Sequence, residues 1–96
     1  MILSFRDQAT EDFYHNRPTH RAARFPASIR STALRKLDVL NAAHRLTDLQ
    51  MPPGNRLEAL KGDLIGFFSI RVNDQWRLIF RWDNNHAYDV ALVDYH

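Results

Sequence analysis

Hydrophobic and polar positions alternate along the last third of the chain, from residue 66 to residue 96. Successive side chains of a strand point to opposite faces, so this alternation predicts three antiparallel strands joined by two tight turns. The even positions supply one aromatic and branched face: Phe68, Ile70, Val72, Trp76, Leu78, Phe80, Trp82, Tyr88, Val90 and Leu92. The odd positions supply a second face that carries charged and phenolic groups: Arg71, Arg77, Arg81, Asp89 and Tyr95.

The register of the first hairpin follows from the need to keep Val72 and Trp76 on the same face. This requirement places Arg71 directly opposite Arg77 across an odd-numbered loop, residues 73–75, which is typical of a hairpin with a bulge. Like charges that face each other across a sheet repel, so stability alone does not favour this pair. We therefore expect an anion to bind between Arg71 and Arg77.

The second hairpin is expected to pair Ile79 with Ala91 and Arg81 with Asp89 by the same rule. The opposite charges of Arg81 and Asp89 indicate a structural cross-strand pair. The aromatic side chains of this hairpin, Tyr88 among them, are assigned to the core by their even positions. Phe67 and Phe68 follow a glycine near the expected rim of a groove, where an exposed ring can stack on a nucleobase.

The first half of the chain begins with an expected short strand, residues 2–6. Asp7 is then expected to cap a short helix that ends near His15, with apolar side chains on its inner side. Both elements lie before a basic, proline-containing loop.

A longer amphipathic helix is expected from Pro26 or Ala27 to about Thr47. Its inner stripe recurs at helical spacing and consists of Ile29, Ala33, Leu37, Leu40 and His44. Residues 51–55 are a proline-rich connector, and residues 56–62 are expected to add a further short strand. The predicted order is β-α-α-β-β-β-β, an α+β fold in which two helices pack on the apolar face of an antiparallel sheet.

Composition sets broad limits on the class of protein. The 96 residues, 45% hydrophobic and 25% charged, are expected to form one domain spanning residues 1–96. The absence of cysteine excludes disulfides, thiolate zinc sites and a cysteine nucleophile. No signal peptide or membrane span is recognisable, so we expect a cytoplasmic protein. Residues 1–48 hold eight basic against five acidic side chains, a distribution that suits contact with an RNA backbone as well as a solvated helix face.

The arginine face suggests phosphate chemistry. Guanidinium forks match phosphate oxygens and stabilise charge that develops on phosphorus. RNA cleavage through its own 2′-hydroxyl needs a base, a cationic clamp and an acid, with no metal. The candidates for these roles are Glu58, Lys61, Tyr95 and His96. A polar sheet face without catalytic function explains the same spacing, and the five histidines show no metal-ligand spacing.

Four ordered motifs resemble one known family. They are PPGNRLEALKGD at 52–63, SIRVNDQWRLIF at 69–80, AYDV at 87–90 and VDYH at 93–96. The chain resembles the HigB-type plasmid-maintenance killer toxins of the RelE/ParE superfamily. The resemblance is dense from Met51 onward and covers the first half only through its layout of elements.

The resemblance implies a RelE-like fold and a toxin of a type II toxin–antitoxin system. It implies an endoribonuclease without cofactor or metal that enters the ribosomal A site and cuts mRNA during translation, which inhibits growth. It also implies a HigA-like helix-turn-helix antitoxin that forms a DNA-binding autorepressor complex with the toxin. We expect no membrane among its partners.

Site residues are carried over motif by motif. The LKG motif supplies Lys61, and the NDQWR motif supplies Arg77 as catalytic residues. The terminal motif supplies catalytic Tyr95 and His96 and substrate-binding Asp94, and Arg71 resembles a second substrate-binding position.

Glu58 departs from the family pattern, which often has histidine three residues before the LKG lysine. A carboxylate accepts a proton near pH 7 but is a poor acid unless it is buried, and it repels phosphate. Two hypotheses remain open. Either Glu58 is the base, with Tyr95 or His96 as the acid, or Glu58 orients Lys61 and His96 is the base.

Two other functions remain open on the same scaffold. The related ParE branch poisons DNA gyrase without cutting RNA. The other alternative is a catalytically weak toxin, which acts with its antitoxin as a transcriptional co-repressor.

Overall fold

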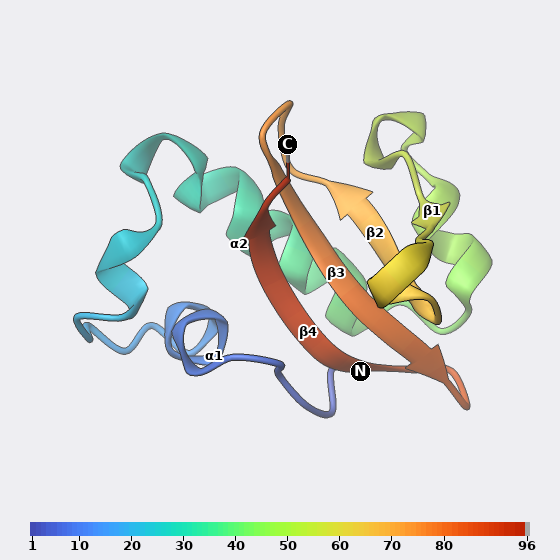
Figure 1. Cartoon of the computed structure of the whole chain (residues 1–96), viewed down its shortest axis with the longest axis horizontal. Helices are drawn as coiled ribbons and strands as arrows, with labels where there is room; N and C mark the ends of the chain where they lie inside the picture. Colours follow the sequence, from blue (N-terminus) through green and yellow to red (C-terminus); the bar gives the residue numbers. More distant parts are fainter. Residues whose placement is uncertain (96) are drawn as a thin grey trace.

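A four-stranded antiparallel sheet organises the computed structural model, which describes residues 1–95 (Figure 1). The strands lie side by side in chain order: β1 (Glu58–Ala59), β2 (Phe67–Arg71), β3 (Trp76–Asp83) and β4 (His86–Asp94). Arg71 lies opposite Arg77 and Ile79 lies opposite Ala91, which confirms both predicted pairs. The strand expected at residues 56–62 is reduced to the two residues of β1.

The two predicted helices are α1 (Gln8–Tyr14) and α2 (Ala27–Ala42). Asp7 caps α1 as predicted, because its Oδ1 accepts a hydrogen bond of 2.7 Å from the backbone N of Thr10. Four short 3-10 turns complete the described chain: η1 (Ala22–Arg24), η2 (Leu46–Gln50), η3 (Pro53–Asn55) and η4 (Gly62–Leu64). Within residues 1–95, neither helix is long and apolar enough to cross a bilayer.

The end of α2 differs from the prediction, because the helix stops at Ala42 and does not reach Thr47. Asp48 accounts for the difference. Its Oδ2 accepts hydrogen bonds of 3.0 Å from the backbone N–H groups of His44 and Arg45, which begins η2 as a separate turn. His44 is therefore exposed and does not extend the buried stripe of α2.

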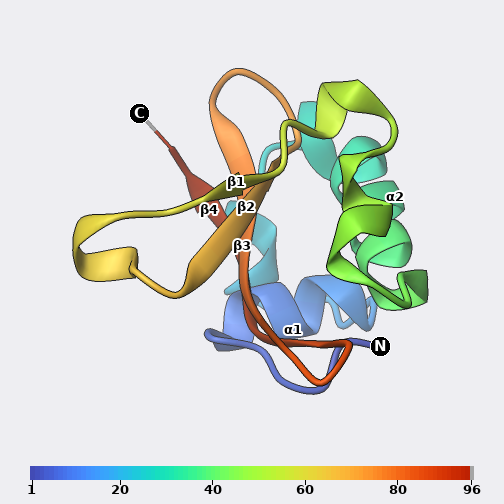
Figure 2. The same ribbon diagram turned by 90° about the vertical axis from the view of Figure 1, so that its right-hand side faces the viewer.

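Both helices cover the same face of the sheet, as Figure 2 shows from the side. The core between the two layers contains side chains from α1, α2 and the three long strands: Ala9, Phe13, Ile29, Ala33, Leu37, Leu40, Ile70, Leu78, Phe80, Val90 and Leu92. The opposite face carries a smaller cluster of Leu60, Ile79 and Ala91. The α+β prediction with two helices on one face is confirmed.

The segment predicted as a first strand pairs with β4 at two isolated points. Ile2 bridges Ala87 and Phe5 bridges Val90, both in the parallel direction. Between these bridges, Ser4 Oγ accepts a hydrogen bond of 2.9 Å from the backbone N of Asp89. The N-terminal segment therefore lies along the free edge of β4 (Figure 1).

A bulge in β4 makes two predictions wrong. Asp89 has a φ of 51°, and the register shifts between Ile79 and Arg81, so that Arg81 lies opposite Tyr88 and not opposite Asp89. Directly opposed residues share a face, so Tyr88 belongs to the arginine face, and Ala87 takes its place in the core. An extra residue of this kind reverses the alternation beyond it.

Asp12 ties α1 to the loop that follows it. Its buried carboxylate accepts hydrogen bonds from Gln8 Nε2 at 2.9 Å and Thr19 Oγ at 2.8 Å. Arg17 donates a longer bond of 3.4 Å, and Arg21 Nη2 lies 3.3 Å from Oδ2. The hydrogen bonds from Gln8 and Thr19, then the hydrogen bond from Arg17 and the charge of Arg21, lower the pKa of Asp12 from 3.8 to about 2.

Substitution of Asp12 by asparagine is expected to weaken the acid dependence of stability. Because the folded pKa is depressed, the ionised carboxylate stabilises the fold fully above about pH 3.8, and this contribution disappears as the pH falls through about 2. Asp12→Asn should lower the melting temperature at pH 7. It should also reduce the loss of melting temperature between about pH 3.8 and about pH 2. Thermal unfolding followed by circular dichroism measures both effects. The exposed Asp38→Asn is the matched control, and an unchanged acid limb in Asp12→Asn contradicts the assignment.

Candidate active site

Two arginines meet on the sheet face that the helices leave uncovered. Arg71 ends β2, Arg77 lies near the start of β3, and the two residues are direct cross-strand partners. Their side chains are 30% and 14% exposed. Two guanidinium groups held this close, one of them mostly desolvated, create a local positive potential that favours an anion.

Arg77 has a different neighbour on each side. Its Cζ lies 5.0 Å from the centroid of the Tyr95 ring, a cation–π distance. Its Nη1 lies 3.9 Å from Glu58 Oε1 and donates a hydrogen bond of 3.4 Å to Ser69 Oγ. Glu58 is the cross-strand partner of Ser69, so β1 and β2 together hold a carboxylate and a hydroxyl beside the guanidinium.

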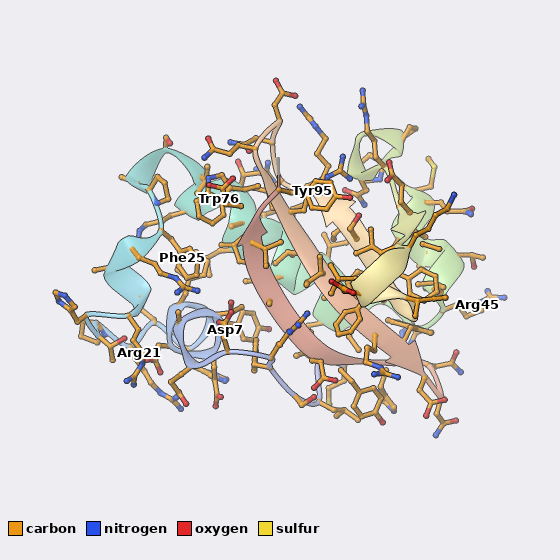
Figure 3. All side chains as sticks on the ribbon, viewed as in Figure 1. Asp7, Arg21, Phe25, Arg45, Trp76 and Tyr95 are labelled. Carbon is orange, nitrogen blue, oxygen red and sulfur yellow. The ribbon has the colours of Figure 1, made fainter. Side chains whose placement is uncertain are left out.

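Tyr95 is fixed by the loop of the first hairpin. Its backbone N donates a hydrogen bond of 2.6 Å to the carbonyl oxygen of Gln75. Gln75 Nε2 also donates to Asp94 Oδ2 at 3.0 Å. Figure 3 shows Tyr95 over the end of the sheet where β3 begins at Trp76. The sequence prediction missed Gln75, because a loop residue at this position carries no pattern.

Arg71 already has an anionic neighbour. Its Nη2 forms a close ion pair with Asp74 Oδ1 in the hairpin loop. The hydrogen bond from Arg71 and then its charge, with a smaller effect of the Arg56 charge, lower the pKa of the Asp74 carboxyl. Asp74 is almost fully exposed, so an anion that reaches Arg71 competes with a carboxylate that water solvates well.

Lys36 of α2 adds a cation near Arg71 from the helical layer. Desolvation lowers the pKa of Lys36, and the charges of Arg35 and Arg71 lower it further. Its Nζ donates a short hydrogen bond to the buried Asn55 Oδ1. The amide of Asn55 in turn donates to the carbonyl oxygens of Leu49 and Met51 at 3.2 and 3.1 Å. This chain of bonds positions the connector that leads into β1, a role that the sequence pattern did not indicate.

The structure brings four of the predicted residues together: Glu58, Arg71, Arg77 and Tyr95. Asp94 lies at the hairpin loop, where it accepts from Gln75. Lys61 is exposed at the start of η4 and forms no ion pair with an acid of the described part of the chain. His96 lies outside the described residues. Ser69 was also missed, although its odd position placed it on the arginine face.

The chemistry of this cluster is that of an oxyanion site. A planar guanidinium binds two oxygens of a phosphate at once, and its electrostatic attraction for them is stronger where water is excluded. A carboxylate and a phenol beside it supply a proton acceptor and a proton donor. Across residues 1–95, no group of three or more histidine and acidic side chains is arranged to hold a metal ion.

Comparison with known proteins shows what this chain is similar to. Residues 3–96 match the family model of the HigB-like toxins, described as the RelE-like toxin of the type II toxin–antitoxin system HigB. The chain is 47% identical over 92 residues to Toxin HigB-1 of Vibrio cholerae serotype O1, which covers 96% of this chain and 95% of that protein. It is 44% identical over 41 residues to Endoribonuclease HigB of Proteus vulgaris, which covers 43% of this chain and 45% of that protein.

A solved structure with a similar fold is the heterotetrameric YoeB–YefM toxin–antitoxin complex from Staphylococcus aureus. The match has a TM-score of 0.59 at 23% sequence identity and covers 100% of this chain and 98% of the other. At this identity the likeness establishes the fold and supports the RelE-like architecture.

Removal of the Asp74 carboxylate is expected to strengthen anion binding at the arginine pair. Asp74→Asn frees Arg71, so the affinity for inorganic phosphate should rise by about two- to fivefold, the range of one exposed ion pair. A phosphate titration followed through the Nε–H signals of Arg71 and Arg77 by NMR measures the change. Asp38→Asn, the same charge change on α2, is the control. Equal tightening in the two variants contradicts a local competition.

Proposed function

The chain belongs to the HigB-like toxins, the RelE-like toxins of type II toxin–antitoxin systems, and from this premise we propose that it is an endoribonuclease that cuts mRNA on the ribosome. A toxin of such a system has an antitoxin as its partner. The name of the Proteus vulgaris relative, which matches over part of both chains, supports the endoribonuclease activity.

The observation that carries the proposal is the direct pairing of Arg71 with Arg77 beside Tyr95 and Glu58. Two like charges held side by side destabilise a sheet unless an anion neutralises them. A scissile phosphate is such an anion, and its negative charge increases when the nucleophile attacks. The arginines therefore stabilise the transition state more than the bound substrate.

The reaction needs only groups that this chain and its RNA substrate supply. A base removes the proton of the ribose 2′-hydroxyl, and the 2′-oxygen attacks the adjacent phosphorus. The bond from phosphorus to the 5′-oxygen breaks, and an acid donates a proton to that oxygen. The products are a 2′,3′-cyclic phosphate and a 5′-hydroxyl end. Arg77 and Arg71 hold the phosphate oxygens throughout.

The position of Glu58 beside Arg77 supports either of its two proposed roles. Its carboxylate lies within 3.9 Å of Arg77 Nη1 and is half exposed, so it can face a bound phosphate from the same side as the guanidinium. As the base, it takes the 2′-hydroxyl proton while Tyr95 or His96 protonates the leaving oxygen. In the second version Glu58 orients Lys61 and His96 is the base.

Lys61, Tyr95 and Asp94 complete the proposed site. Lys61 is exposed on the connection between β1 and β2, from which its long side chain extends to a phosphate once RNA lies on the sheet face. Tyr95 packs against Arg77 and keeps the phenol at the reacting phosphate. Asp94, held by Gln75, contacts substrate at the end of the sheet.

The proposed partners follow from the same premise. The antitoxin is a HigA-like helix-turn-helix protein, and its complex with the toxin binds DNA and represses their operon. The ribosomal A site presents the mRNA, and the arginines of residues 17–36 contact ribosomal RNA backbone. Such a target places the toxin in the cytoplasm.

Arg77→Ala is expected to abolish the cleavage of mRNA. Loss of one preorganised charged group at a transition state costs about 10²–10³ in rate. Induction in cells, with 5′ ends of mRNA and DNA breaks mapped in parallel, should show in-frame cuts on translated messages with the wild type only. Arg45→Ala, an exposed arginine outside residues 17–36, should cut like the wild type. Growth arrest with intact mRNA and broken DNA identifies a gyrase poison, and no arrest identifies the co-repressor.

Glu58→Gln and His96→Ala separate the two proposed bases. The variant that removes the base should cut ribosome-bound mRNA about 10²–10⁴-fold more slowly in a single-turnover assay, because general base catalysis contributes that much. Loss of the acidic limb of the pH–rate profile should accompany the slower rate only in that variant. Full activity of both variants contradicts both versions of the mechanism.

A further inference from the structure

A second cluster of aromatic and cationic side chains lies on the arginine face of the sheet, away from Arg77. The Cζ atoms of Arg6 and Arg81 lie 5.1 and 5.6 Å from the centroid of the Phe67 ring. Phe67 and Arg81 are direct cross-strand partners, and Arg6 comes from the N-terminal segment beside β4. Three separate parts of the chain therefore place two guanidinium groups around one phenyl ring.

Within residues 1–95, the two guanidinium groups have no acidic partner. Arg6 and Arg81 are exposed, and neither forms an ion pair or a side-chain hydrogen bond with any residue of the described chain, 1–95. Each of the other arginines on this face has a carboxylate neighbour. Phenyl rings and guanidinium planes both stack on nucleobases, so the cluster offers planar surfaces suited to a base.

A shallow cavity of about 530 Å³ opens beside this cluster. It is lined by Gly66, Arg81, Trp82, Asp83, Tyr88 and Asp89. The bulge at Asp89 creates this lining, because it turns Tyr88 onto the arginine face opposite Arg81. Gly66, with a φ of 92°, brings the β1–β2 connection to the cavity without a side chain.

The charges of the cavity identify the part of a nucleotide that fits. Arg81 donates hydrogen bonds, and the carboxylates of Asp83 and Asp89 accept them. A phosphate meets repulsion from the two carboxylates. A nucleobase carries acceptors that match Arg81, donors that match the two carboxylates and a flat face for stacking.

We propose that Phe67, Arg6 and Arg81 form a subsite for a nucleobase of the RNA substrate at a distance from the scissile phosphate. This inference rests on the proposed endoribonuclease function. Arg81 lies four residues beyond Arg77 on β3, about 13 Å along the strand at about 3.3 Å per residue. The subsite therefore binds a nucleotide that is not joined directly to the scissile phosphate.

The placement of the cluster favours RNA over a segment of the antitoxin. Phe67 and Arg71 lie on β2, and Arg77 and Arg81 lie on β3, with all four side chains on one face. A single strand held at Arg71 and Arg77 can follow the two strands directly to Phe67 and Arg81. The two carboxylates of the cavity repel an acidic peptide that the free arginines would otherwise attract.

The test uses the full chain and RNA in which fluorine replaces every 2′-hydroxyl, so that no nucleophile is present. NMR titrations with a dinucleotide and with a longer oligonucleotide follow the Arg77 Nε–H signal and the backbone amides of Gly66 and Arg81. The dinucleotide should shift only Arg77. The longer RNA should shift both sets and bind more tightly.

Phe67→Leu and Arg81→Gln should each weaken binding of the longer RNA by roughly tenfold, the scale of one base–aromatic stack, and leave dinucleotide binding unchanged. Abasic nucleotides one position beyond those that flank the central phosphate should produce the same loss in the wild type. Phe68→Leu is the matched control, because Phe68 is the next residue of β2 and packs into the core on the other face. This control should bind both RNAs like the wild type.

The outcomes separate the two proposals. Shifts at Arg77 alone with both RNAs overturn the subsite and leave the endoribonuclease site intact. Shifts at Gly66 and Arg81 alone overturn the proposed active site and keep the base subsite. No shift at either place contradicts both. Unchanged RNA affinity with weaker antitoxin binding in Phe67→Leu and Arg81→Gln overturns the subsite in favour of a protein contact.

Discussion

Burial of the apolar face of the β2–β3 hairpin determines the strand register, and this register puts two guanidinium groups next to each other on the opposite face. Ile70, Leu78 and Phe80 are completely buried against the helices, and each contributes about 1.5–3 kcal/mol. A like-charged cross-strand pair costs about 1 kcal/mol or less. A one-residue slip would separate Arg71 from Arg77 but would also expose all three apolar side chains. The core therefore forces the charge contact at the centre of the candidate site, and the contact does not need to be stable by itself.

Elements with a strict local pattern could be predicted from the sequence. The alternation in residues 66–96 specified three strands and the register of the first hairpin, and Asp7 marked the start of α1 by a known capping preference. Features that depend on one residue or on distant contacts could not be predicted. The bulge at Asp89 breaks the alternation only where Ser4, from the other end of the sequence, binds its backbone. The early end of α2 depends on Asp48, whose carboxylate accepts hydrogen bonds from the backbone of His44 and Arg45, a contact that helical spacing does not reveal.

The candidate site shows the same division. The alternation of odd and even positions predicted that Arg71 lies opposite Arg77, and it also predicted that both share a face with Tyr95. Contacts made by loops, such as that of Gln75 with Tyr95, have no periodicity and were found only in three dimensions. The resemblance to the toxin family named Lys61, which the structure shows as an exposed residue at the start of η4 and which no local pattern marks as a site residue.

The N-terminal segment, residues 2–5, lies along the edge of β4. This contact joins parts of the chain that are far apart in sequence, since Ser4 and Asp89 are 85 positions apart. During synthesis the N-terminal segment leaves the ribosome early and has no strand to pair with until β4 follows. Such long-range closure is slow, because the whole intervening chain must be ordered first. Tyr95 reaches Arg77 only after the same step. The candidate site therefore assembles late: a nascent chain without β4 lacks the contact between Tyr95 and Arg77 until the sheet is closed.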